Sequence, residues 1–570
     1  MKIQIKQLIK NGSRGILDIL FFILLTVPAS AGLENLPVQD GGRIKPFDTF
    51  AREMLSLVYG RETYKGKPAV DIVFSWMLIP DEWEQTEFLL IRHSGLREAL
   101  KLDKKKLYYK PSDLLVNDRI GLLIQELKNK REAQEKLDPF SQAVQTLENQ
   151  ISAFHGVRLG LALRVHPPLS SESHNWLNIT ELDGAAKVNF EEITRRYIDL
   201  AAAESKIIEA TKKKESSKII DELRKNKKQA DLALSETTVN YIKSVESSYG
   251  DYSHRGKISA ELAYNKYHPF RFAWVLSLCA LIFFSFAYFG TKPSWMKIGW
   301  LLTGAALVFQ MIGFAARVYI LERAPVTNMF ETVAWVAFTT IIMAAVFYKI
   351  YEYKILPLAA NMVSTLSLIL CDVSSSVLDD SLSPLEPVLR DNFWLLTHVV
   401  IIVTSYAAFF LAFFIGDILL FYFLRDEKKY AEKITHGANS IYRCIQVGVV
   451  LLAAGVILGG IWADYSWGRF WGWDPKETWA FIALLGYLVI LHGRLVGWLR
   501  NFGLAASSVV AFSLVIMAWY GVNFVLGAGL HTYGFGAGGV EYVSAFVCAH
   551  LLFVAYVTTL RQSRLKGLKT

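Results

Sequence analysis

A tryptophan-rich loop is the part of the sequence best suited to hold a small molecule. Four tryptophans fall within thirteen residues: Trp467, Trp471, Trp473 and Trp479. An aromatic belt at a membrane–water interface would account for one or two of them. It would not gather them in one loop with Gly468 and Gly472 between them, since glycine lets the backbone turn sharply or approach a ligand closely. The pattern favours a flat, large, apolar ligand that stacks on indole faces.

Two histidines flank this loop in the topology derived below. His398 lies near the outer end of one apolar segment, and His531 follows another within a glycine-rich stretch. A single histidine at a helix end is usually structural or solvated. Two histidines on the same side of the membrane as the tryptophans are better explained as axial ligands of one haem iron, because neutral imidazole binds haem iron well.

Nine apolar segments after His268 must position these residues. Each is long enough to cross a bilayer of about 30 Å at 1.5 Å per residue. The predicted helices span approximately residues 270–289, 298–316, 333–350, 355–372, 396–424, 441–462, 477–494, 503–523 and 540–560. The mean hydropathy of the 570 residues is +0.28, and 13% of them are aromatic. This composition excludes a disordered or collagen-like chain, and we expect an all-α polytopic membrane protein.

The distribution of basic residues sets the expected orientation. If the polar segment 32–268 lies outside, the inner loops and the tail carry 15 of the 21 basic residues that follow it. This bias agrees with the positive-inside rule. The tryptophan loop, His398 and His531 then lie on the outer, periplasmic face of a bacterial cytoplasmic membrane.

The N-terminus has the parts of a secretory signal peptide. Four basic residues within positions 2–14 precede the apolar run Ile16–Val27 and the small residues Ala29–Ala31. An uncleaved, slightly short anchor is the alternative. In both cases we expect residues 1–31 to deliver the chain from Gly32 onward across the membrane.

The polar segment 32–268 is predicted to be a mainly helical extracytoplasmic domain. Leu114–Leu127 has apolar residues at helical spacing, and Phe190–Ser247 is rich in Lys, Glu and Ala without proline or glycine. With 36 basic and 35 acidic residues the segment is nearly neutral, which argues against a nucleic-acid surface despite the net charge of +9. Its scattered histidines are interpreted as surface or core residues: His93, His155, His166, His174 and His254.

The four cysteines lie in or beside the apolar segments without C-x-x-C or metal-ligand spacing. We interpret them as small buried thiols: Cys279, Cys371, Cys444 and Cys548.

These motifs resemble one family. The run from Trp467 to Trp479 (W-G-x-x-W-x-W-D-P-K-E-x-W) is similar to the WWD signature of the CcsA/CcmC/CcmF haem-handling membrane proteins. Ala324–Glu331 and Gly521–Gly534 resemble the CcsA branch, which belongs to System II of cytochrome c synthesis. The likeness spans roughly residues 270–560. Together with the N-terminal pattern and the composition of the polar segment, it gives three expected parts: a signal or anchor at 1–31, the outer domain at 32–268 and a haem-handling transmembrane domain at 269–570.

The resemblance implies a cytochrome c haem lyase. Haem b would pass from the cytoplasmic side along His492, whose place in the family pattern is that of an intramembrane ligand. His398 and His531 would then hold the iron at the outer face while the four loop tryptophans position the ring. The two thiols of a Cys-x-x-Cys-His segment in apocytochrome c would add across the haem vinyl groups.

The resemblance also gives roles in the reaction to His398, His531, Trp471, Trp473 and Asp474. Two interpretations are open for Asp474 and Glu477. They could orient a histidine or Lys476, or they could cap the helix that begins near Pro475, where acidic residues suit the helix dipole. Capping is the preferred interpretation for Glu477.

One departure concerns the second intramembrane histidine, which fused synthases of the family take from a CcsB/ResB portion. No convincing partner for His492 is found in this sequence, so we hypothesise that a separate CcsB/ResB-like membrane protein supplies it. His550 matches no position with a role in the family, and a helix–helix hydrogen bond is its expected use. The expected partners are therefore this protein, apocytochrome c, haem and membrane lipid.

Two other functions are compatible with the same residues. The protein could export haem or present it to another protein without ligation, as the CcmC branch does for a periplasmic chaperone. It could also be a quinone-binding or scaffold subunit whose tryptophans only anchor it at the interface.

Overall fold

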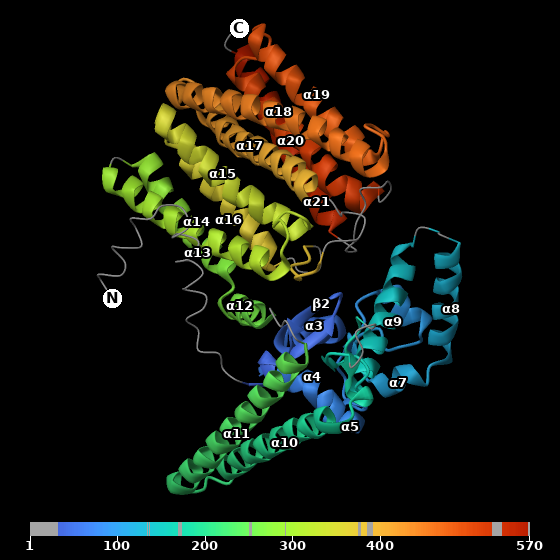
Figure 1. Cartoon of the computed structure of the whole chain (residues 1–570). Helices are drawn as coiled ribbons and strands as arrows, with labels where there is room; N and C mark the ends of the chain where they lie inside the picture. The colour runs from blue at the N-terminus through green and yellow to red at the C-terminus, as the bar shows by residue number, and fades with distance from the viewer. Residues whose placement is uncertain are drawn as a thin grey trace. The chain divides into compact units, whose positions relative to one another are not determined.

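The computed structural model describes residues 32–133, 135, 137–168, 174–249, 254–290, 292–373, 378–384, 392–526 and 539–567. The chain divides into two compact units, and the division falls between Tyr267 and His268 (Figure 1). The predicted signal or anchor segment 1–31 and the predicted ligand His531 lie outside the described residues.

The first unit is mainly helical, as predicted, with short antiparallel strand pairs between its helices. Its helices are α3 (Phe47–Tyr59), α4 (Ala69–Leu78), α5 (Pro80–Glu84), α6 (Ser94–Ala99), α7 (Pro111–Leu115), α8 (Asp118–Glu132), α9 (Pro139–Arg158), α10 (Gly184–Lys212), α11 (Ser217–Tyr249) and α12 (His254–Tyr267), with 3-10 turns at Leu33–Asn35 and Ile179–Glu181. The strand pairs are β1 (Pro37–Asp40) with β2 (Arg43–Pro46), β3 (Thr63–Tyr64) with β4 (Lys67–Pro68), β5 (Leu89–Leu90) with β6 (Tyr108–Tyr109), and β7 (Arg164–His166) with β8 (Leu177–Asn178).

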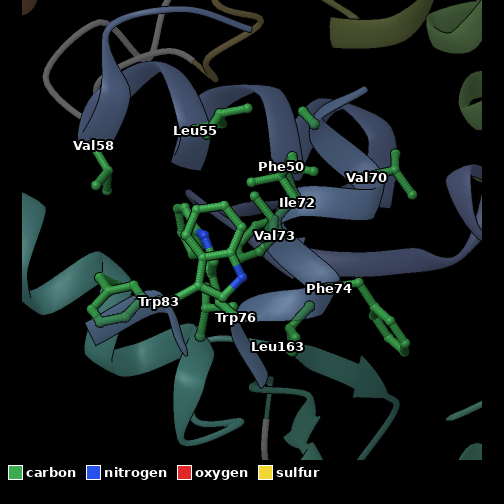
Figure 2. Packing of buried hydrophobic residues seen from close by; sticks show 14 of the residues in the cluster. Phe50, Leu55, Val58, Val70, Ile72, Val73, Phe74, Trp76, Trp83 and Leu163 are labelled. Carbon is green, nitrogen blue, oxygen red and sulfur yellow. The ribbon is translucent and has the colours of Figure 1, made fainter. Parts of the chain in front are cut away.

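An aromatic core holds this unit together. Trp76 of α4 is fully buried, and its ring centroid lies 6.4 Å from that of Trp83 (Figure 2). The Trp83 indole donates a hydrogen bond to Ser75 Oγ at 2.9 Å, so its polar edge is satisfied inside the core. Phe88 packs edge-on against Trp83, Phe154 packs edge-on against Trp76, and the two phenylalanine rings pack edge-on against each other. Burial of several large rings explains how a nearly neutral, polar segment folds as a compact unit.

The two helical predictions for this unit are correct in type but not in extent. Phe190–Ser247 contains α10 and α11, which lie side by side (Figure 1) and are separated at residues 213–216, where Lys214 has a φ of +54°. Leu114–Leu127 is likewise interrupted, because Asn117 accepts a hydrogen bond from the backbone N–H of Arg119 and starts α8.

The second unit contains all nine predicted apolar segments as helices. They are α13 (Pro269–Phe289), α14 (Pro293–Leu321), α15 (Met329–Tyr351), α16 (Ile355–Val373), α17 (Asn392–Arg425), α18 (Ala431–Trp467), α19 (Pro475–Leu495), α20 (Asn501–Ile516), which continues as the π-helix Met517–Leu526, and α21 (Val540–Gly567). Nine helices of the described chain are long and apolar enough to cross a membrane. The chain is an all-α polytopic membrane protein, as predicted.

Helix α17 is central to this unit. It packs along α18, α20 and α15. Its Phe409 ring stacks on Tyr487 of α19 at 3.7 Å between centroids, and its Phe410 ring stacks on Phe512 of α20 at 4.6 Å. Gly448 of α18 lets the two helices approach closely, because a Cβ there would lie 2.4 Å from the Phe409 ring. Side chains carried by α17 are therefore held on a rigid element.

Candidate functional site

A cavity of about 220 Å³ lies where the starts of α15, α17 and α19 meet the ends of α18 and of the π-helix. Its lining is mostly apolar and comes from the residues Ala324, Val326, Thr327, Asn328, Met329, Thr332, Leu396, His398, Val399, Ile402, Val403, Tyr406, Val456, Gly459, Gly460, Trp462, Phe470, Trp471, Lys476, Glu477, Ala480, Ala518, Trp519 and Asn523. An apolar cavity with a few converging polar groups is the usual form of a small-molecule site.

His398 is the imidazole in this lining. It is 6% exposed, and its ring stacks on Trp462 with 5.3 Å between centroids and 25° between planes. Its Nδ1 lies 2.7 Å from the backbone oxygen of Trp394, one turn earlier in α17. A ring nitrogen that donates to a carbonyl fixes the tautomer and assigns metal binding to the other nitrogen, here Nε2.

Two glycines of α18 make room for this arrangement. A Cβ on Gly459 would lie 3.4 Å from the His398 ring, and a Cβ on Gly460 would lie 2.6 Å from the Phe470 ring. Phe470 and Trp462 both line the cavity, yet sequence reasoning did not single them out. The sequence feature that could have indicated them is the pair Gly459-Gly460, about two helical turns before the loop.

The loop tryptophans do not all face the cavity. Trp471 lines it, whereas Trp467, Trp473 and Trp479 are absent from its described lining. Trp467 packs edge-on against Trp462 with 4.6 Å between centroids. Trp473 is 69% exposed and has a φ of +56°. The structure thus brings His398, Trp462 and Trp471 together and directs Trp473 outward.

Asp474 and Glu477 form a capping box at the start of α19. The Asp474 carboxylate accepts a hydrogen bond from the backbone N–H of Lys476 at 2.9 Å, and Glu477 Oε2 accepts one from the N–H of Asp474 at 3.3 Å. Glu477 also accepts from the N–H of Gly472 at 2.8 Å, which fixes the tryptophan loop to the helix. The preferred interpretation of Glu477 as a cap is confirmed, and Asp474 shares that role.

The two further segments singled out in the sequence meet at the same cavity. The Asn523 amide donates to the backbone oxygen of Trp519 at 2.8 Å and approaches Met329 Sδ at 3.5 Å. The Trp519 indole donates to Thr332 Oγ1 at 3.1 Å. These contacts join the start of α15 to the π-helix. Residues 527–534 of the second segment lie outside the described residues.

His492 lies apart from the cavity, near the C-terminal end of α19. Its side chain is exposed on the second unit, and its Nδ1 lies 2.8 Å from the backbone oxygen of Leu488. As with His398, this contact leaves metal binding to Nε2.

Both ring nitrogens of His550 have polar contacts with neighbouring groups. Nδ1 lies 2.8 Å from the backbone oxygen of Phe546, and Nε2 lies 3.4 Å from Asp417 Oδ2. This contact between α21 and α17 is of the kind predicted for His550.

The cysteines of the described chain are free thiols, and its residues form no metal cluster. Cys371 and Cys444 are buried as predicted, and Cys279 is half-buried. The prediction is wrong for Cys548, which is exposed because α21 packs on only one side, against α17 and α20. Within the described residues, no group of three or more His, Cys, Asp or Glu could hold a metal ion.

Comparisons with known proteins agree on one family. The model of the family described as cytochrome C assembly protein matches residues 306–531, a range that includes most of the cavity lining. A cytochrome c biogenesis protein CcsA from Prochlorococcus marinus is 34% identical over an alignment of 250 residues, which covers 37% of this chain and 76% of that protein.

A longer relative covers both units. Protein NrfI of Wolinella succinogenes is 27% identical over an alignment of 532 residues, which covers 89% of this chain and 55% of NrfI. An alignment of that extent includes most of the first unit, and this chain spans about half the length of NrfI. A solved structure of the cytochrome c heme lyase CcmF aligns with 52% of this chain and 50% of that chain, at 14% identity and a TM-score of 0.36, too low to indicate a shared fold.

Proposed function

Because this chain belongs to the CcsA-type cytochrome c assembly proteins, we propose that it moves haem to the outer face of the membrane and attaches it there to apocytochrome c. A role in cytochrome c assembly follows from the family. The transport and ligation steps below are our proposal.

The observation that carries the proposal is the setting of His398. Its Nδ1 donates a hydrogen bond to the backbone oxygen of Trp394, and its ring stacks on Trp462 in apolar surroundings. An imidazole held in this way offers Nε2 to an iron in a pocket suited to a porphyrin ring. In this proposal haem b is a substrate, Trp471 bounds the ring, and His531 supplies the second axial ligand as in the family.

The ligation itself needs positioning more than acid–base chemistry. Each thiol of the Cys-x-x-Cys-His segment adds across one vinyl group, so a C–S bond forms, the thiol proton moves to the neighbouring carbon, and no electrons are gained or lost overall. Holding the thiols and the vinyl groups in contact can lower the activation barrier by about 7–11 kcal/mol. The exposed indole of Trp473 lies on the same loop as Trp471 and can contact the outer edge of the ring.

The route to the outer face is proposed to involve a second protein. His492 is exposed on the second unit, so a histidine of a neighbouring chain can reach the opposite side of an iron bound there. A CcsB/ResB-like membrane protein is the proposed source. In this scheme residues 32–268 and the tryptophan loop lie on the periplasmic side of the bacterial cytoplasmic membrane, in agreement with the distribution of basic residues.

The test is a reporter cytochrome coexpressed with this chain and a CcsB/ResB-like protein. We expect covalent haem on a reporter that carries Cys-x-x-Cys-His, none on a Ser-x-x-Ser-His reporter, and a fall of at least a hundredfold with His398→Ala. Bound haem in the purified protein without any covalent product would instead support the exporter or chaperone function. A wild type without haem in the presence of the partner would contradict both.

A further inference from the structure

A buried ion network lies behind the cavity wall formed by residues 324–329. Its centre is Glu331 in the first turn of α15, whose Oε1 accepts a hydrogen bond from Arg317 Nε and whose Oε2 accepts one from Arg323 Nη1, each at 2.8 Å. The exposed fractions of the three side chains are 0%, 0% and 4% for Glu331, Arg317 and Arg323. Charges buried to this degree persist only when they are closely paired.

The same carboxylate fixes the cavity wall. Glu331 Oε2 also accepts hydrogen bonds from the backbone N–H and the hydroxyl of Thr327, at 2.9 and 3.1 Å. The side chain of Asn328 accepts the Glu331 backbone N–H at 2.8 Å. Thr327, Asn328 and the neighbouring Val326 and Met329 all line the cavity. The position of this wall therefore depends on the carboxylate behind it.

The two guanidinium groups tie the network to the segment that precedes α17. Arg317 donates to the backbone oxygens of Asp380 and Ser381 at 2.9 and 3.1 Å. Arg323 donates to the oxygen of Ser383 from Nε and Nη2, at 3.0 and 2.9 Å. One network therefore holds both a cavity wall and the described segment 380–383, which precedes α17 in the chain.

We propose that Glu331 is a positioning residue that sets the distance between the 324–329 wall and His398, and so the geometry in which a bound haem meets Nε2. This inference rests on the proposed function, since it takes haem as the ligand. Glu331 does not line the cavity and acts only through Thr327, Asn328 and the two arginines. A charged network of this kind has one satisfied arrangement, and such an arrangement can hold a site to within a fraction of an ångström.

The test uses Thr327→Val, which keeps the shape of the side chain and the backbone hydrogen bond to Glu331 but removes the hydroxyl that contacts Glu331 and Arg323. Haem is titrated into the haem-free full-length protein with its CcsB/ResB-like partner, and the absorption spectrum is recorded. We expect about tenfold weaker binding, the effect of one hydrogen bond to a charged group, together with a high-spin fraction that the wild type lacks. Thr327→Ser keeps the hydroxyl and should restore both the affinity and the low-spin spectrum.

A matched control distinguishes the proposed effect on the cavity wall from the effect of losing any ion pair. Glu427→Gln breaks the pair between Glu427 and Arg561, which lies at the opposite ends of the helices, and should leave the spectrum unchanged. Thr327→Val with wild-type affinity and spectrum, or Thr327→Ser without rescue, would overturn the inference alone. If Thr327→Val fails to fold, Thr327→Ala removes the same hydroxyl without a branched apolar side chain, and the same spectral outcomes decide. A wild type that binds no haem would overturn the proposed function as well.

Discussion

Two histidines of the membrane helices make the same local contact in different surroundings. His398 and His550 each direct Nδ1 to the backbone oxygen four residues earlier, at 2.7 and 2.8 Å. His398 then lies against Trp462 in an apolar cavity, whereas the Nε2 of His550 meets the Asp417 carboxylate. The contact with the helix backbone is thus no sign of function. The surroundings of the whole ring, an apolar cavity or a carboxylate, are what distinguish the proposed haem ligand from a histidine with a structural contact.

The difference also explains why one region is hollow and the other is packed. Around His398, the α18 residues Gly459 and Gly460 carry no side chain, which leaves room beside the rings of His398 and Phe470. Around His550, the rings of Phe413 and Phe546 lie at 4.9 and 4.3 Å between centroids. A haem cannot approach His550 without displacing both rings and the carboxylate.

Filling the hollow region should have the largest effect. Gly460→Ala places a Cβ 2.6 Å from the Phe470 ring, so this ring, which lines the cavity, must shift. Overpacking typically costs about 1–3 kcal/mol, and we expect a ten- to hundredfold loss of bound haem, measured as pyridine haemochrome per protein. Gly304→Ala, where a Cβ meets nothing within 4 Å, is the control. Equal haem content in both variants would contradict this view of the cavity.

Removing the stacking partner of His398 should have a smaller effect. Trp462→Leu keeps the site apolar but removes an aromatic contact worth about 0.5–1.5 kcal/mol. We expect a two- to tenfold fall in haem affinity and a broader reduced α-band, both largely recovered in Trp462→Phe. An unchanged band in Trp462→Leu would show that the indole does not orient the imidazole.

The packed region should respond in stability and not in haem content. A double-mutant cycle with His550→Phe and Asp417→Leu should give a coupling near 0.6 kcal/mol, and at most about 1.7 kcal/mol, the range of hydrogen bonds between membrane helices. Denaturation in detergent measures the coupling, and haem content should stay at the wild-type level. A loss of haem in His550→Phe would remove the distinction between the two histidines.

Hydrophobic length predicted the second unit well. All nine apolar segments are helices, because a membrane span must satisfy its own backbone hydrogen bonds and be long enough to cross. The break between α10 and α11 was not predictable from the sequence. Lys214 adopts a positive φ there, and the segment contains no glycine or proline, the residues that usually indicate a helix end.

The site was predictable where its residues share a motif and not where they meet only in space. His398, predicted from the topology, and Trp471, predicted from the tryptophan motif, both line the cavity. The preferred interpretation of Glu477 as a cap is confirmed, whereas the role of Asp474 was left open. Trp462 was overlooked as a site residue because it precedes the loop by several residues, although it forms the contact with His398. The ion pair between Arg317 and Glu331 joins two helices, so the sequence of either helix alone could not predict it.

The most direct test of the central claim is an absorption spectrum of the purified protein, coexpressed with a CcsB/ResB-like partner, in oxidised and reduced forms. The wild type, His550→Asn and the double variant His398→Ala/His531→Ala are compared. We predict sharp reduced bands of six-coordinate low-spin haem in the wild type and in His550→Asn, and their loss or broadening in the double variant. A wild type without haem, or a double variant with unchanged bands, would contradict the account.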